Sequence, residues 1–230
     1  MNHDDLKTKA RGLSIGLFGA DLGNLRRAAQ NIAEWDCNIL HFDVMDGVFV
    51  PEMIGGPGFV AATDIGMLID VHLMVQNPVD HVDSYINAGA DIITVHAESN
   101  NAAEAIVRIK AAEKTACRPV LAGLALMPDT TLNEAAPLLA LKPDIILVLS
   151  FDPRGAPVDI PTACQRLTDL RALAPDAVLS FEGGVTKETI DEIAACGPDM
   201  MVSSNAILDV KKPKRAYDAM LKALAKCIKT

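Results

Sequence analysis

Short runs of hydrophobic residues recur along the chain at intervals of roughly 25–30 residues, and polar stretches separate them. Runs of this length, rich in Val, Ile and Leu, are typical of buried strands. The strands that we expect are Leu13–Leu17, Asn38–Asp43, Leu68–Leu73, Asp91–His96, Pro119–Leu124, Asp144–Leu149, Ala177–Phe181 and Asp199–Ser203.

Segments with the periodicity of amphipathic helices lie between and after these runs. The clearest of them are Asn24–Trp35, Val79–Ala88, Asn101–Lys114, Lys187–Ala195 and a final helix, Ala216–Ile228. Strands that alternate with helices predict right-handed βαβ units and a parallel sheet. A closed (β/α)8 barrel has eight such units, and 230 residues are enough for them. We therefore predict an α/β protein with one (β/α)8 TIM-barrel domain over residues 1–230.

The composition agrees with parallel strands covered by helices. Half of the residues are hydrophobic, but aromatic residues make up only 4%, so Ala, Val, Ile, Leu and Met must build the core. The net charge is −9 and the isoelectric point is about 5.0. Because an acidic surface repels phosphate backbones, nucleic acids and anionic membranes are poor partners for this chain.

The chain shows no signal for secretion or for a membrane span. Its first ten residues, MNHDDLKTKA, are mostly polar and contain no apolar run, so we expect no signal peptide. No apolar run approaches the ~20 residues that a spanning helix needs. The five cysteines lie far apart and form no CxxC pair, which favours reduced thiols that act as small core residues in a cytoplasmic protein. They are Cys37, Cys117, Cys164, Cys196 and Cys227.

Three side chains at the ends of two predicted strands have the chemistry of metal ligands. His41 and Asp43 point to the same face of their strand, because side chains alternate. His72 ends the next strand at the same level, and the carboxyl ends of barrel strands form the mouth where active sites lie. Taken alone, His41 and Asp43 could instead be a structural pair that hydrogen-bonds loops, but a second histidine favours a metal. Mixed imidazole and carboxylate ligands suit Zn, Mn, Fe or Co ions.

A fourth candidate ligand, Glu182, ends the seventh predicted strand, across the mouth from the second. Gly183 and Gly184 follow it and free the backbone to turn and to present N–H groups to an anion. The loops after the seventh and eighth strands of such barrels commonly bind phosphate. A plain tight turn is the alternative interpretation of these glycines.

Two carboxylates beside one metal suggest a specific reaction. A carbon next to a ketone loses its proton when the resulting enediolate is stabilised, and a metal on its oxygens provides that stabilisation. Asp43 and Glu182 could act as the acid/base pair on opposite faces, so that the stereocentre inverts. Met45 and Met74 end the same strands as the histidines, where they either limit water around the reacting carbon or simply fill space.

Four segments resemble the signature segments of the ribulose-phosphate 3-epimerase family: HFDVMDGVFVPEM, DVHLMVQNP, AGADIITVHAE and FEGGVTKETI. They occur in order over nearly the whole chain. The resemblance implies an isomerase that epimerises C3 of a ketose phosphate, such as ribulose 5-phosphate or xylulose 5-phosphate. It implies one divalent metal ion, Zn first and otherwise Fe, Mn or Co, on His41, Asp43, His72 and position 182. It also implies a small anionic sugar substrate and a homo-oligomer, either a dimer or a hexamer.

The chain departs from the family at positions around the substrate. The family's DGG motif begins with Asp, where this chain has Glu182, one methylene longer. Gly19 stands where the family has a substrate-contacting Ser. Ser204 and Asn205 replace the family's Gly-Ser after the last strand, and we retain both as substrate-binding candidates.

The loop after the sixth predicted strand also differs. The family has a glycine-rich NPGFGGQ loop, and this chain has the shorter stretch Asp152–Pro157, which contains Arg154. We predict an altered substrate whose anionic end contacts Arg154 through charge-assisted hydrogen bonds. That substrate is either another sugar phosphate or one that carries a carboxylate. A solvated loop charge is the alternative interpretation of Arg154.

Two other functions remain open. One is a decarboxylase of the related phosphate-binding barrels that acts on keto-sugar-acid phosphates, but no predicted strand end supplies the Lys that such sites use. The other is a metal and sugar-phosphate binding protein without turnover. His96 and His81 receive no ligand role, and we expect His81 on a helix surface.

Overall fold

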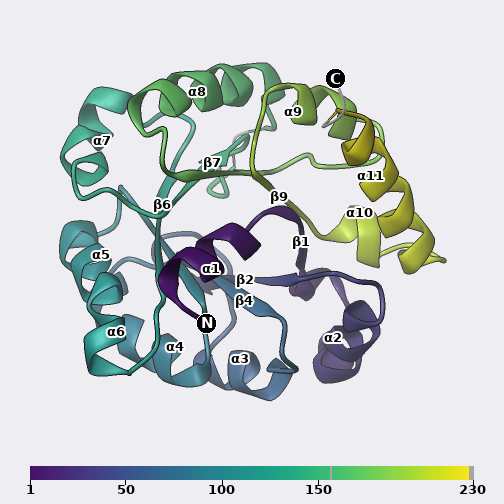
Figure 1. The fold of residues 1–230 in the computed structure, drawn as a ribbon, viewed down its shortest axis with the longest axis horizontal. Coiled ribbons are helices and arrows are strands. Elements are labelled where there is room, and N and C mark those ends of the chain that lie inside the picture. The colour runs from purple at the N-terminus through teal and green to yellow at the C-terminus, as the bar shows by residue number, and fades with distance from the viewer. Residues whose placement is uncertain (156, 228–230) are drawn as a thin grey trace.

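The computed structural model describes residues 1–155 and 157–227, which form a closed barrel of eight parallel strands (Figure 1). The first strand pairs with both the second and the last, which closes the ring. The strands are β1 (Gly12–Gly16), β2 (Ile39–Asp46), β4 (Leu68–Met74), β5 (Ile92–His96), β6 (Leu121–Leu126), β7 (Ile145–Leu149), β8 (Val178–Glu182) and β9 (Met200–Ser203). All eight predicted strands and the predicted barrel are confirmed. A ninth strand, β3 (Met53–Ile54), was not predicted and pairs antiparallel with the end of β2.

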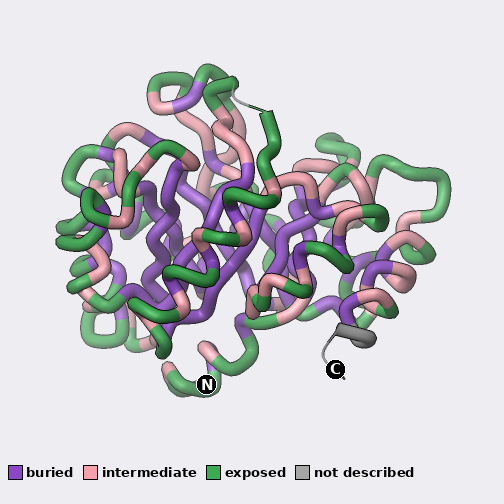
Figure 2. The backbone as a smooth tube through the Cα atoms, turned by 90° about the horizontal axis from the view of Figure 1, so that it is seen from above, coloured by how far each residue is buried: buried purple, intermediate pink, exposed green. Residues whose placement is uncertain are grey.

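Helices surround the barrel and leave the strands buried inside (Figure 2). They are α1 (His3–Lys9), α2 (Leu25–Ala33), α3 (Pro57–Thr63), α4 (Val82–Ala88), α5 (Ala102–Lys110), α6 (Ala112–Thr115), α7 (Leu132–Leu139), α8 (Ile160–Leu173), α9 (Ile190–Ala195), α10 (Asn205–Leu208) and α11 (Pro213–Cys227). Short 3₁₀ turns lie at Leu17–Gly19, Leu22–Asn24 and Pro78–Asp80.

The predicted helices differ from the observed ones mainly at their ends. The segment expected as one helix, Asn101–Lys114, forms α5 and α6, which meet at Ala111. The last helix starts at Pro213, three residues earlier than predicted, since Pro fits the first turn of a helix. Its predicted end, Ile228, lies outside the described residues.

The helix α1 crosses the amino-terminal end of the barrel, and the sequence pattern did not predict it (Figure 1). A capping box starts it: the Asn2 side chain accepts a hydrogen bond from Asp5 N (2.8 Å), and the Asp5 carboxylate accepts one from Asn2 N (3.4 Å). Leu6 and Ala10 pack beneath the barrel. They join a layer made of the first residue of seven strands: Ile39, Leu68, Ile92, Leu121, Ile145, Val178 and Met200.

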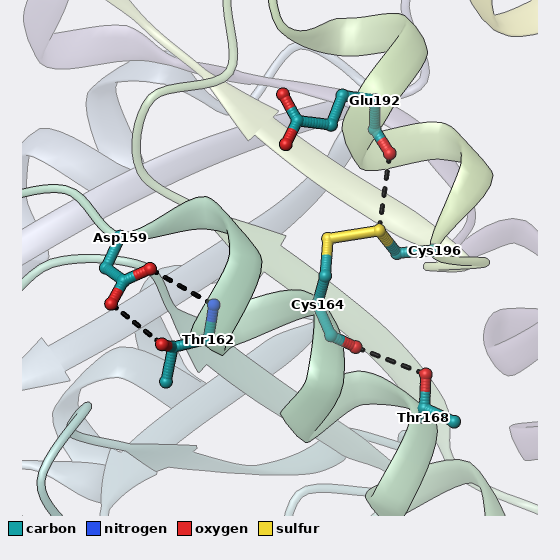
Figure 3. Close-up of a disulfide and its surroundings, with 6 residues drawn as sticks. All are labelled: Asp159, Thr162, Cys164, Thr168, Glu192 and Cys196. Atoms are coloured by element: carbon teal, nitrogen blue, oxygen red, sulfur yellow. Dashed lines mark hydrogen bonds between the residues drawn. A yellow bond between two sulfur atoms is a disulfide. The ribbon is translucent and has the colours of Figure 1, made fainter.

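Cys164 and Cys196 form a disulfide between α8 and the end of α9 (Figure 3). The expectation of reduced thiols is therefore wrong for this pair. Because 32 residues separate the two cysteines, only the folding of α8 beside α9 brings their Cα atoms to 5.4 Å. Cys37 is buried as expected, whereas Cys117 is exposed. The side chain of Cys227 lies outside the described residues.

None of the helices in the described part of the chain is both long enough and apolar enough to span a bilayer.

Candidate active site

The register between β2 and β4 brings three of the predicted ligands together. Asp43 pairs with His72, and His41 pairs with Asp70, so these side chains lie level at the end of two adjacent strands. Glu182 is the last residue of β8 and reaches the same point across the barrel. The structure thus gathers all four residues that the sequence indicates as metal ligands.

One atom from each of the four residues faces a common point. Asp43 Oδ1 lies 3.2 Å from His41 Nε2 and 3.3 Å from His72 Nδ1. Glu182 Oε2 lies 3.3 Å from His72 Nδ1 and 3.6 Å from His41 Nε2. All four atoms lie within 4.8 Å of one another.

The four separations of 3.2–3.6 Å are close to those between ligand atoms that share one divalent ion. With bonds of about 2.0–2.1 Å to nitrogen and oxygen, the ligand atoms of a tetrahedral zinc site lie about 3.3–3.4 Å apart. Glu182 Oε2 is buried and makes no well-aligned hydrogen bond among the described residues, although His72 Nδ1 lies 3.3 Å away. A buried carboxylate oxygen without a partner is costly, and a cation between the four atoms would remove that cost.

The charges of the cluster also call for a cation. Three buried or half-buried carboxylates, Asp43, Asp70 and Glu182, surround two buried imidazoles. Burial lowers the pKa of His41, but the three carboxylates outweigh it and raise this pKa well above its usual value. Burial likewise opposes protonation of His72, yet Glu182 and Asp43 raise its pKa to about 9. The site therefore attracts a positive charge, either protons or a divalent ion.

Both imidazoles use their second nitrogen for a buried hydrogen bond. His41 Nδ1 lies 2.7 Å from Asp70 Oδ2. His72 Nε2 lies 2.8 Å from His96 Nε2, and His96 Nδ1 lies 3.1 Å from Glu98 Oε2. His96 lies outside the group of four ligand-type residues. Its position against His72 is a feature that sequence reasoning missed, because His72 pairs with Thr94 and contacts His96 two residues further along β5.

A cleft of about 490 Å³ opens at the mouth of the barrel beside the cluster. The predicted site residues that line it are Asp43, Met45, Glu182, Gly183, Gly184, Ser204 and Asn205. Met74 is among the predicted residues outside this lining and is 2% exposed, so it packs in the interior. His41 and His72 are also buried and lie behind the carboxylates.

Arg154 lies on the loop between β7 and α8, outside the lining of the cleft. Its guanidinium donates to both carboxylate oxygens of Asp152 at 2.6–3.0 Å and to Asp129 at 3.4 Å. Phe151 and Val158 of the same loop do line the cleft. Ala156, also in this loop, lies outside the described residues.

The glycines after β8 have backbone conformations that few other residues adopt. Gly183 has φ of 103° and Gly184 has φ of 64°. A β-carbon on Gly184 would lie 2.8 Å from Val158 Cγ1, so side chains are excluded here. These glycines keep one wall of the cleft lined by backbone.

Sequence reasoning missed several lining residues, of which Glu52 and Thr186 are the polar ones with the clearest chemistry. Glu52 precedes β3 in the family-like FVPEM stretch, which was the signal that could have found it. Within the described lining there are carboxylates at Asp43, Glu52 and Glu182 and no Lys or Arg. An anionic group in this cleft must therefore rely on backbone N–H groups and hydroxyls, or on a cation that reaches in from a neighbouring loop.

Comparison with known proteins gives one consistent family. The profile described as the Ribulose-phosphate 3 epimerase family matches residues 13–208. The ribulose-phosphate 3-epimerase of Escherichia coli (strain K12) is 34% identical over 223 residues, which are 93% of this chain and 96% of the relative. That of Chlamydia trachomatis is 30% identical over 215 residues, 89% of each chain.

Solved structures share the fold at much lower identity. KGPDC from Streptococcus mutans has a TM-score of 0.73 and 13% identity, covering 95% of this chain and 99% of that one. 3-Keto-L-gulonate-6-phosphate decarboxylase from Vibrio cholerae has a TM-score of 0.71 and 16% identity, covering 94% and 98%. At these identities the likeness concerns the barrel alone.

Proposed function

Because the chain belongs to the ribulose-phosphate 3 epimerase family, we propose that it is a metal-dependent epimerase that inverts C3 of a ketose phosphate. The candidate substrates are ribulose 5-phosphate, xylulose 5-phosphate or a related sugar phosphate. The observation that carries the proposal is the convergence of His41, Asp43, His72 and Glu182 on one point beside the cleft.

The four ligand atoms would hold one divalent ion, with Zn²⁺ first and Fe, Mn or Co ions as alternatives. When bound, such an ion supplies positive charge next to the substrate's carbonyl and hydroxyl oxygens while C3 loses its proton. The histidines of the site are buried, whereas both carboxylates reach the cleft. We therefore propose that the two imidazoles only bind the ion, whereas the two carboxylates bind the ion and also contact the substrate.

Asp43 and Glu182 are the proposed acid/base pair. Asp43 projects from β2 and Glu182 from β8, and both line the cleft. A substrate carbon held between them presents one face to each carboxylate. One carboxylate removes the proton from C3 and the other delivers a proton to the opposite face, so the configuration inverts.

The anionic end of the substrate is best accommodated beyond Glu182. Gly183 and Gly184 line that end of the cleft with backbone, and Ser204 and Asn205 line it after β9. Backbone N–H groups and hydroxyls bind phosphate without a positive side chain. Arg154 remains a proposed contact, supported by its place on a loop that borders the cleft, where a substrate anion can replace Asp152 as the partner of its guanidinium.

The exchange of C3 hydrogen with solvent tests this function. Incubation of the protein with ribulose 5-phosphate and a small panel of ketose phosphates in D₂O should place deuterium at C3 of the turned-over substrate and yield its C3 epimer. Metal analysis of the same preparation should find one divalent ion per chain. Sugar-phosphate binding without deuterium uptake would identify a binding protein instead.

A decarboxylase of the same barrel type is disfavoured by the lining of the cleft. The solved decarboxylase structures share only the fold with this chain. Among the described residues of the lining there is no Lys beside the strand-end carboxylates. Carbon dioxide release from a keto-sugar-acid phosphate in the same panel would support the decarboxylase.

We also propose a cytoplasmic location and a homo-oligomeric assembly, either a dimer or a hexamer. A relative from rice, 31% identical over 222 residues, is named as a cytoplasmic isoform. Sedimentation of the purified protein measures the assembly directly.

A further inference from the structure

A buried chain of hydrogen bonds leads from the metal-ligand cluster to Glu98. His72 Nε2 lies 2.8 Å from His96 Nε2, and both side chains are completely buried. The ring centroids lie 4.9 Å apart and the ring planes differ by 22°, so the two rings meet edge to edge through their Nε2 atoms. On the far side of His96, Nδ1 lies 3.1 Å from Glu98 Oε2. The path thus crosses from the end of β4 to the end of β5 and into the loop beyond it.

Glu98 is itself fixed by the loop after β6. Its Oε1 accepts a hydrogen bond from Met127 N at 3.0 Å and another from the Thr130 hydroxyl. Burial raises the pKa of Glu98, but the hydrogen bonds from His96 and Thr130 outweigh it, and the pKa lies below its usual value. Glu98 therefore stays an acceptor on both oxygens.

The acceptor at Glu98 decides where each imidazole carries its hydrogen. His96 Nδ1 must bear a hydrogen to donate to the Glu98 carboxylate, so neutral His96 leaves Nε2 as a bare acceptor. The 2.8 Å contact then requires the hydrogen of His72 to sit on Nε2. In neutral His72, the form that a metal ion binds, Nδ1 faces Asp43 and Glu182 and is left with a free lone pair.

If both hydrogen bonds ran in the opposite direction, the contact between His96 and Glu98 would be lost. If His96 Nε2 donated to His72, neutral His96 would turn a bare Nδ1 toward a carboxylate, and two acceptors would meet at 3.1 Å. The hydrogen of His72 would also move to Nδ1, where it would block a metal ion. Only one direction of the chain satisfies every hydrogen bond.

We propose that His96 and Glu98 are positioning residues that hold His72 in the form that ligates metal through Nδ1. This inference rests on the metal centre of the proposed function. The other histidine of the centre supports the logic, because His41 Nδ1 is held by the buried carboxylate of Asp70 at 2.7 Å. His72 has the same kind of support with one imidazole inserted. Oriented ligands of this kind bind metal more tightly.

The test is the affinity of the purified protein for Zn²⁺, measured by competition with a chromophoric chelator and without substrate. Glu98→Gln has only one acceptor oxygen and cannot serve both His96 and the loop after β6. We expect its Zn²⁺ affinity to fall about 10- to 100-fold. The matched control is Glu134→Gln, because Glu134 is exposed on α7 and the described hydrogen bonds of its carboxylate go only to Thr131.

A second pair of variants separates positioning from packing. His96→Gln keeps an acceptor for His72 and a donor for Glu98, whereas His96→Leu fills the space and keeps neither. We expect the Gln variant to bind Zn²⁺ more tightly than the Leu variant. In Zn²⁺-loaded protein, ¹⁵N spectra of the histidines should show the His72 hydrogen on Nε2 in the wild type.

The outcomes are distinct. Two results together support the inference. Glu98→Gln binds Zn²⁺ more weakly than the wild type while Glu134→Gln does not, and His96→Gln binds Zn²⁺ more tightly than His96→Leu. Equal Zn²⁺ affinity of Glu98→Gln and the wild type overturns the inference and leaves the proposed metal centre intact. A wild type that binds no divalent ion overturns the proposed metal centre, and this inference falls with it.

Discussion

Gly19 and Ser204 occupy one space: a β-carbon on Gly19 would overlap the Ser204 hydroxyl and lie 2.7 Å from Asn205 Oδ1. The Ser204 hydroxyl donates to Gly16 O at 2.9 Å, which holds it in that space. The hydroxyl that the sequence lacks at position 19 is thus present at position 204, on the opposite side of the same gap. Two of the positions at which the chain departs from the family therefore lie in direct contact.

We expect Gly19→Ala to lower the free energy of unfolding by about 1–3 kcal/mol, because the added methyl overpacks this gap. Ser204→Gly in the same chain should recover a large part of that loss, since it empties the space. Urea unfolding of the two single variants and the double variant measures the coupling. Strictly additive effects would show that the two positions do not compete.

His72→Ala should remove the divalent ion and, with it, deuterium exchange at C3. The reason is that His72 Nδ1 faces both carboxylates of the cluster. Metal content by elemental analysis is the measurement. His81→Ala is the control, because His81 is exposed and outside the cluster. Full metal occupancy in His72→Ala would refute the ligand assignment.

Asp43→Asn and Glu182→Gln should each lower kcat by about 10²–10⁴, the usual contribution of a general acid or base. Each variant retains one base, so we expect residual solvent exchange from one C3 epimer without conversion to the other. Proton NMR in D₂O distinguishes exchange from inversion. Glu188→Gln, a change to an exposed acid, should behave like the wild type. Near-normal inversion by either site variant would exclude the two-base scheme.

Arg154→Ala should raise KM for the preferred anionic substrate about ten- to a hundredfold, because a charge-assisted contact is lost. Ribulose 5-phosphate should be turned over less efficiently than that substrate. The control is Arg108→Ala, which removes a comparable surface pair with Asp83. If ribulose 5-phosphate is turned over efficiently with and without Arg154, the guanidinium is only the partner of Asp152.

Metal affinity should increase with pH between about 6.5 and about 9. In the ion-free protein the pKa of His72 is raised to about 9, so its imidazole is protonated over this range. A metal ion must displace that proton, and each displaced proton changes the apparent affinity about tenfold per pH unit. By the same linkage, the ion-free protein loses folding stability as the pH rises through about 9. Chelator competition at several pH values measures the first effect, and a flat profile would contradict it.

The strands and most of the candidate ligand cluster could be predicted from the sequence, because both depend on local pattern. Side-chain alternation placed His41 and Asp43 on one face, and equal strand lengths placed His72 level with them. The supporting contacts did not follow, since the pairing of His96 with His72 depends on the spacing of neighbouring strands. The Cys164–Cys196 disulfide was missed for a similar reason: it depends on how two helices pack.

The helix α1 gives the barrel a floor. Leu6 of α1 and the first residues of seven strands form a layer at the amino-terminal end of the barrel. Each side chain in this layer is at most 8% exposed. Water therefore approaches Asp43 and Glu182 from the mouth, the side on which the substrate enters. In the proposed epimerase, a bound sugar phosphate would therefore close the one open side of the site. We expect Asp43 and Glu182 to exchange protons with bulk water mainly between turnovers, after the product has left.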